Sequence, residues 1–147
     1  MTVKVFLDTS VLVAAVVDNH DAHARAFAVL TRIHDGKDEG FVSAHSVAEM
    51  FAVLTRLPPP FRHTPEQALL SIEENVVKHF TLQALSGNDY ISLVREAALA
   101  GVQGGMIYDA VLLRGAAKAG VDRIYTLNLR HFQALAPPSL VSLLSIP

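Results

Sequence analysis

Three carboxylates and one amide stand where the strands of a parallel sheet would end. They are Asp8 after a first apolar run, Glu49 in the helix after a second, Asp109 at the opening of a later helix and Asn128 after a fourth run. Such sheets collect their ligand sites beyond the carboxyl ends of the strands, so we expect these side chains to share one crevice. Three carboxylates in one crevice repel one another unless a cation lies between them. Because cysteine is absent and there is no HExxH motif, the oxygen donors favour Mg²⁺ or Mn²⁺ over zinc.

Each acidic residue also has an interpretation that needs no ligand. Asp8 and Asp109 stand where side chains commonly cap helices, and for Asp8 taken alone capping is the more common role. Glu49 lies in residues 44–57, where apolar side chains surround the helix almost completely, so that helix is expected to be buried. Arg56 is seven positions away, so no neighbour on the helix is expected to neutralise a buried Glu49 carboxylate. For Glu49 this favours a functional role.

Apolar runs and helix signals alternate along the chain. Strands are expected at residues 3–7, 40–43, 79–85, 123–127 and 140–144. Helices are expected at residues 11–17, 22–33, 44–57, 64–77, 86–100 and 108–119. Thr64, Pro65 and Gln67 form a helix start, and Gly120 is typical of a helix end. This alternation predicts an α/β fold with a mainly parallel sheet of about five strands and helices on both faces.

Length and composition limit the class of protein. The chain has 147 residues, which predicts a single domain over residues 1–147, and its 51% hydrophobic residues argue against disorder. The net charge of −2 provides no overall basic field for nucleic acid, so a polyanion must be bound locally. The apolar run at residues 11–17 is too short to cross a bilayer, and Asp8 argues against a signal peptide. We expect a cytoplasmic protein, and the high apolar content favours a homodimer.

Four blocks of the sequence resemble one known family. They are residues 7–13 (LDTSVLV), 43–57 (SAHSVAEMFAVLTRL), 104–111 (GGMIYDAV) and 125–132 (YTLNLRHF). In this order they resemble the PIN-domain proteins, and within them the VapC-type toxin ribonucleases. The resemblance implies a three-layer PIN fold and an Mg²⁺- or Mn²⁺-dependent endoribonuclease that is restrained by a small cognate antitoxin.

The resemblance also assigns roles to single residues. It implies that Asp8, Glu49 and Asp109 are the metal ligands and that hydroxyls orient the site at Thr9, Ser10 and Thr126. The chain departs from the pattern at one point, because many relatives carry a fourth acid where this sequence has Asn128 or His131. Asn128 is counted among the catalytic residues, since its amide oxygen can bind a metal or a metal-bound water without adding charge.

The catalytic hypothesis is cleavage of structured cellular RNA, such as a tRNA or rRNA loop. Asp8 and Asp109 would hold the metal, and Glu49 would act as a ligand or as the base that orients water. The cations expected near the RNA phosphates are Arg56, Arg114, Lys118 and Arg130.

Two other functions remain open. A PIN domain that has lost turnover could serve as an RNA-binding or assembly module. A Rossmann-like nucleotide-binding protein has the fold analogy in its favour but lacks the glycine fingerprint, because Gly104 and Gly105 match neither GxGxxG nor GxxxxGK[ST].

Overall fold

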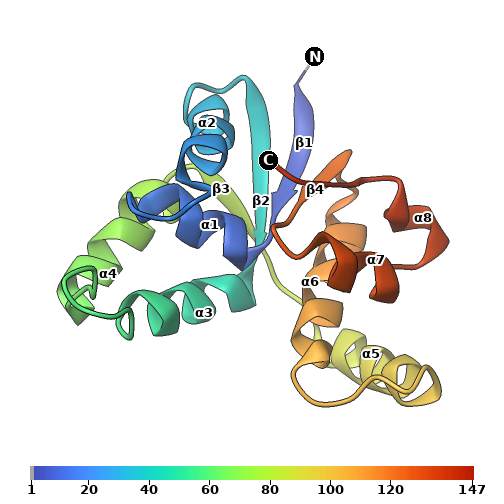
Figure 1. Ribbon diagram of the computed structural model, residues 1–147. Coiled ribbons are helices and arrows are strands. Elements are labelled where there is room, and N and C mark those ends of the chain that lie inside the picture. The colour runs from blue at the N-terminus through green and yellow to red at the C-terminus, as the bar shows by residue number, and fades with distance from the viewer. Residues whose placement is uncertain (1) are drawn as a thin grey trace.

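The fold is built on a five-stranded parallel sheet. The computed structural model describes residues 2–147, and its strands lie in the order β3-β2-β1-β4-β5 (Figure 1). The strands are β1 (Val3–Leu7), β2 (Asp38–Ser43), β3 (Phe80–Gln83), β4 (Arg123–Tyr125) and β5 (Leu144–Ser145). Every pairing between neighbouring strands of this sheet is parallel. The predicted α/β architecture is therefore confirmed.

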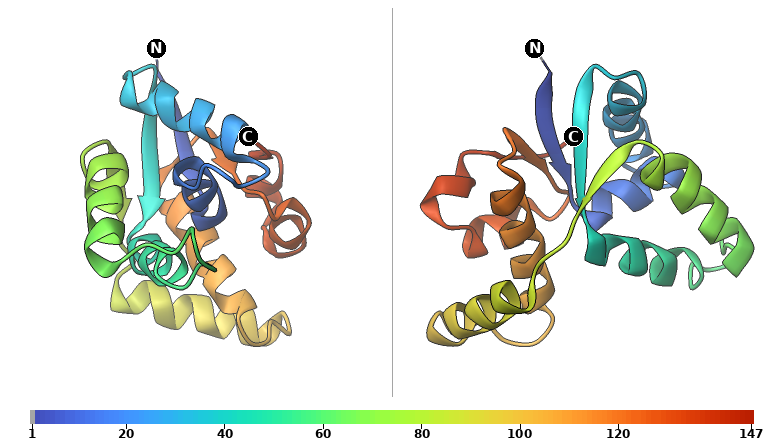
Figure 2. Two further views of the ribbon diagram at one scale, coloured as in Figure 1. Left: turned by 60° about the vertical axis from the view of Figure 1, so that its left-hand side comes forward. Right: turned by 180° about the vertical axis from the view of Figure 1, so that it is seen from behind.

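Helices cover both faces of the sheet (Figures 1 and 2). They are α1 (Thr9–Val16), α2 (His23–His34), α3 (Ala44–Leu54), α4 (Pro65–Ile72) with its π-helical extension η1 (Glu73–Val77), α5 (Gly87–Leu99), α6 (Met106–Ala119), α7 (Leu129–Leu135) and α8 (Pro138–Val141). In residues 2–147 no helix is both long and apolar enough to cross a membrane.

The alternation of β1 side chains divides the core between the two faces. Val5 and Leu7 belong to the core formed with α1 to α4, whereas Phe6 belongs to the core formed with α6 to α8. All three are almost fully buried, as expected for a central parallel strand that is covered on both sides. Helix α5 packs on α6 and projects beyond the sheet (Figure 1).

The local signals of the sequence place several helix ends. Thr64 and Gln67 exchange the two hydrogen bonds of a capping box at the start of α4, as predicted. Gly120 ends α6 with φ of 65°, a left-handed conformation that favours glycine. Helix α3 ends at Leu54, earlier than predicted, and Pro58 disfavours helical backbone at Leu57, the residue before it.

The prediction for the C-terminal region was wrong in part. The expected strand at residues 140–144 is instead the end of α8 followed by the short strand β5. Pro138 occupies the first turn of α8, where its missing N–H costs nothing. Helix α7 was not predicted.

Candidate active site

The candidate site lies where the strand order changes direction. The chain runs from β1 outward to β3 and then returns to the other side of β1 as β4. Leu7 and Tyr125 are paired in register, so the next residues, Asp8 and Thr126, leave the sheet side by side. The Asp8 N–H donates to the Tyr125 carbonyl at 3.0 Å, and the Thr126 hydroxyl donates to Asp8 Oδ2 at 2.9 Å. Parallel sheets bind their ligands at this kind of crossover.

Asp8 is a buried carboxylate held by two hydroxyls. It is 4% exposed, and the Ser10 hydroxyl donates to Oδ2 at 2.6 Å in addition to the bond from Thr126. Burial raises the pKa of Asp8, and these two hydrogen bonds lower it in part. Asp8 stands at the N-cap of α1, yet its side chain makes no capping hydrogen bond. Its strongest contacts are the two hydroxyls, one of them from the turn after β4.

A third hydroxyl, that of Thr9, connects α1 to α3. Thr9 Oγ1 lies 2.8 Å from Ser46 Oγ and 3.2 Å from Glu49 Oε1. Thr9 and Ser46 are both buried, so the position of the hydroxyl beside Glu49 is fixed by packing. Glu49 is thereby directed toward the start of α1, the helix whose N-cap is Asp8.

Two expectations for Glu49 were wrong. Its side chain is 39% exposed, because α3 buries only one stripe of residues, among them Met50, and leaves Phe51 on the open side. Glu49 also has a partner on its own helix, since His45 Nε2 lies 3.5 Å from Glu49 Oε1. The spacing of four residues between these side chains is visible in the sequence and would have identified the pair.

Asp109 completes the acidic group from the opposite face of the sheet. It lies in the first turn of α6 behind the N-cap Gly105, so Asp109 itself is not the cap. Its pKa is raised by partial burial, then by the negative charges of Asp8 and Glu49, while the charge of His131 lowers it. The charges of Asp8 and Glu49, from two other elements, thus reach Asp109.

The carboxylate oxygens of Asp8, Glu49 and Asp109 are the kind of ligand that a hard divalent cation prefers. Within residues 2–147, no three His, Asp or Glu side chains are already gathered closely enough to hold a metal ion. The donors nevertheless are carboxylates, whose mutual repulsion a cation would relieve. Both hydroxyls on Asp8 donate to Oδ2, and neither donates to Oδ1.

The position of the expected fourth acid carries neutral and basic groups. The Asn128 N–H donates to Thr126 Oγ1 at 2.9 Å, and the Asn128 side chain is exposed at the start of α7. The Ser10 hydroxyl accepts from the neighbouring Leu127 N–H at 3.2 Å. His131 is exposed on α7, and its charge acts on Asp109. Thr126 therefore fixes both Asp8 and the turn that presents these side chains.

The four predicted RNA-binding cations fall into two groups. Arg56 and Arg130 are exposed. Arg114 and Lys118 instead pair with Glu96 and Asp89 of α5, the latter pair at 2.6 Å. At 3.6 residues per turn, Arg114 points about 140° and Lys118 about 180° away from Asp109 around α6.

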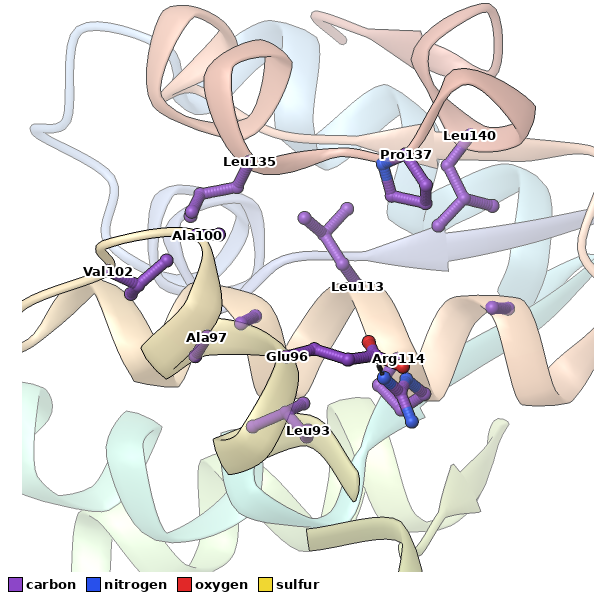
Figure 3. A pocket seen from close by; sticks show the side chains of 12 residues that line it. Leu93, Glu96, Ala97, Ala100, Val102, Leu113, Arg114, Leu135, Pro137 and Leu140 are labelled. Atoms are coloured by element: carbon purple, nitrogen blue, oxygen red, sulfur yellow. Dashed lines mark hydrogen bonds and ion pairs between the residues drawn. The ribbon is translucent and has the colours of Figure 1, made fainter. Parts of the chain in front are cut away.

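A separate apolar cavity of about 240 Å³ lies between α5, α6 and α8 (Figure 3). Leu93 and Ala97 of α5, Leu113 of α6 and Leu140 of α8 line it, with the Arg114–Glu96 pair at its edge. None of the three acids of the candidate site belongs to its lining. The cavity is therefore distinct from the acidic site.

Comparison with known proteins identifies the family. The family model for the PIN domain matches residues 5–136. Ribonuclease VapC40 of Mycobacterium tuberculosis is 36% identical over 124 residues, which are 84% of this chain and 85% of that protein. Ribonuclease VapC27 of the same species is 31% identical over 112 residues, 76% of each chain.

Two solved structures share the fold. Mycobacterium tuberculosis VapC20, described as a sarcin-ricin loop cleaving toxin, has a TM-score of 0.68 at 16% identity and covers 88% of this chain and 94% of its own. VapBC2 of Rickettsia felis, bound to a DNA fragment from its promoter, has a TM-score of 0.66 at 17% identity and covers 98% of both chains. The family model, the relatives and the sheet topology agree, and the chain belongs to the PIN-domain family.

Proposed function

We propose that the protein is a divalent-metal-dependent endoribonuclease that acts on structured RNA. The observation that carries this proposal is geometric: Thr126 donates to Asp8 where β1 and β4 end, and Thr9, the residue after Asp8, lies 3.2 Å from Glu49. The charges of Asp8 and Glu49 also raise the pKa of Asp109, which comes from a third element. The proposal is supported by two relatives named ribonucleases, which the chain matches over three quarters or more of its length.

In this proposal the acids hold the cation and the hydroxyls hold the acids. Asp8, Asp109 and Glu49 are the metal ligands. Ser10 and Thr126 orient Asp8, and Thr9 orients Glu49, through the hydrogen bonds described above. Such bonds to ligating carboxylates fix the ligand geometry and tune affinity for the metal.

The cation, when bound, would activate the attacking water and neutralise the charge that develops on the scissile phosphate. The Glu49 side chain is 39% exposed and can orient that water or accept its proton. Asn128 stands beside the site as an uncharged polar group, in place of a fourth acid.

The substrate class follows from the charge of the protein and from its relatives. A net charge of −2 supports local recognition of RNA rather than binding by a broad basic surface. Arg56 and Arg130 are exposed, and within residues 2–147 neither forms an ion pair, so we propose them as phosphate contacts. We propose a tRNA or rRNA loop as substrate, a class supported by the description of VapC20 as a sarcin-ricin loop cleaving toxin.

A cognate antitoxin, a homodimer and a cytoplasmic location complete the proposal. The VapBC2 structure is a complex of related fold and supports an antitoxin partner. Apolar side chains exposed on α5, including Tyr90, Ile91 and Val94, support association with another chain.

The second candidate is a PIN domain without turnover that binds RNA or assembles with other proteins. Asn128 and His131 favour it, because neither supplies the negative charge of a fourth acid. Under this alternative the protein would bind RNA without cutting it, and loss of the acids would leave RNA affinity unchanged.

Cleavage of RNA loops in Mg²⁺ and in Mn²⁺ tests the proposal against this alternative. We expect wild type to cut a hairpin RNA from the tRNA and rRNA loop classes, and EDTA to stop the reaction. Asp8→Asn and Asp109→Asn should abolish cleavage. Asp35→Asn is the matched control, because it makes the same change on the exposed end of α2. Folded protein that binds these RNAs and cuts none of them would favour the module without turnover.

A further inference from the structure

Two aromatic rings stack beside the acidic site. The His45 and Tyr108 rings have centroids 5.3 Å apart and planes inclined by 9°. His45 comes from the first turn of α3 and Tyr108 from the first turn of α6, so the stack joins the two helices that carry Glu49 and Asp109.

The stack is continuous with the carboxylates. His45 Nε2 lies 3.5 Å from Glu49 Oε1, and Tyr108 immediately precedes Asp109 in the chain. The edge of the His45 ring therefore lies near an acid of the site, and a face of the same ring lies against Tyr108. A nucleotide whose phosphate reaches Glu49 and Asp109 brings a neighbouring base close to this stack.

Tyr108 leaves much of its ring open to solvent. It is 53% exposed although the His45 ring is stacked, with an offset, against part of one face. More than half of the residue is thus accessible to a second planar group. Among the described residues no hydrogen bond involves the Tyr108 hydroxyl, so neither burial nor a polar contact of the protein accounts for this residue type.

We propose that Tyr108, supported from behind by His45, is a stacking platform for one unpaired base of the RNA next to the scissile phosphate. This inference rests on the proposed ribonuclease function. Unpaired bases present their faces to aromatic side chains, whereas bases in a duplex are already stacked on both sides. The platform therefore selects loops and other unpaired segments. Because every base has a π-face, it tolerates different bases.

The alternative is that the stack only fastens α3 to α6. A fastening role requires the contact with His45 but assigns no function to the exposed remainder of the Tyr108 ring. The two roles differ in a measurable way, because only the platform makes the effect of Tyr108 depend on a base in the substrate.

The test combines a protein variant with an abasic substrate. The probe is a hairpin RNA whose loop carries all four bases, together with a series in which each loop position in turn lacks its base. Cleavage in Mg²⁺ gives kcat/KM for wild type, Tyr108→Leu and Tyr108→Phe. Phe27→Leu is the matched control, since Phe27 is an exposed aromatic residue beside His23 on α2. Binding of the same RNAs is followed by fluorescence anisotropy.

For wild type, we expect one abasic position to lower kcat/KM by about fivefold or more, the effect of losing one base stacked on an aromatic ring. Tyr108→Leu should lower kcat/KM on the intact RNA by a similar factor and should be insensitive to that abasic position. Tyr108→Phe keeps the ring and should keep the sensitivity to that abasic position, and Phe27→Leu should behave as wild type.

Two results would overturn the platform. Tyr108→Leu could keep the full abasic sensitivity of wild type, or it could lose activity equally on every RNA, as expected if the stack only fastens the helices. If wild type cuts no RNA, the proposed function fails, and the same pattern in the anisotropy data decides separately whether Tyr108 stacks on a base.

Discussion

Thr126→Val removes one hydroxyl from beneath the acidic site and keeps the shape of the side chain. Thr126 is fully buried, donates to Asp8 Oδ2 at 2.9 Å and accepts from the Asn128 N–H at 2.9 Å. After the substitution only the Ser10 side chain still donates to the Asp8 carboxylate. The change therefore tests directly whether the hydroxyls support a buried charge.

The expected cost follows from the charge on the acceptor. A hydrogen bond to a charged group contributes about 1.5–3 kcal/mol, and valine leaves no cavity, so the free energy of unfolding should fall by about 2 kcal/mol at pH 7. For a chain of this size that corresponds to a fall in Tm of about 4–8 °C. The bond favours the ionised carboxylate, so its loss raises the pKa of Asp8 further. The loss of unfolding free energy caused by Thr126→Val should therefore grow as the pH rises through the pKa of Asp8 in the folded protein.

Urea denaturation of metal-free protein at pH 4 and at pH 7 measures the effect. Thr31→Val is the matched control, because the Thr31 hydroxyl donates at 2.9 Å to the neutral carbonyl of Phe27. We expect the control to cost about 1 kcal/mol or less at both pH values. A Thr126→Val cost equal to that of the control at pH 7, or one that is the same at both pH values, would refute the view that Thr126 stabilises an ionised Asp8.

Three further predictions concern electrostatics and packing. Asp109→Asn should raise the Tm of metal-free protein at pH 7 while abolishing cleavage. The pKa of Asp109 in the folded protein lies above its usual value, so ionisation of Asp109 destabilises wild type as the pH rises, and the Tm difference between variant and wild type should shrink at pH 4. A variant Tm equal to or below that of wild type at pH 7 would contradict the unfavourable burial and charge repulsion at Asp109. Lys118→Met should raise the pKa of Asp89 from about 2 toward 3.8, as followed by NMR titration of the carboxyl carbon, and a pKa that stays near 2 would exclude Lys118 as its cause. Gly40→Ala should lower the free energy of unfolding, measured by urea denaturation, by about 1–3 kcal/mol, because a Cβ there would lie 2.7 Å from both Ile33 and Phe80. Gly87→Ala is the control and should change this free energy little, because there is open space around Gly87.

The sheet and most helices could be predicted because their signals are local. Apolar runs, the Thr64 capping box and the stop at Gly120 each depend on a few neighbouring residues. Helices α7 and α8 are short, and their positions depend on packing of Phe132 and Leu140 into the core shared with α6. Periodicity over so few residues does not distinguish a helix from a strand.

The acids of the site could be predicted from their places after strands, but their surroundings could not. The degree to which Glu49 is buried depends on which stripe of α3 meets the core, and α3 is apolar on nearly every side. The pairing of Arg114 and Lys118 with α5 depends on a helix that lies beyond the sheet. The His45–Glu49 spacing was visible in the sequence, whereas the contact of His45 with Tyr108 joins residues far apart along the chain.

Calorimetric titration of metal-free protein with Mn²⁺ at pH 7 tests the central claim most directly. Wild type should bind the ion, and Asp8→Asn and Asp109→Asn should each weaken binding by at least about tenfold, since the loss of a supporting partner alone costs about 10–100-fold. Asp35→Asn should bind as wild type does. Folded Asp8→Asn and Asp109→Asn proteins that bind Mn²⁺ with the affinity of wild type would contradict a shared cation between these carboxylates.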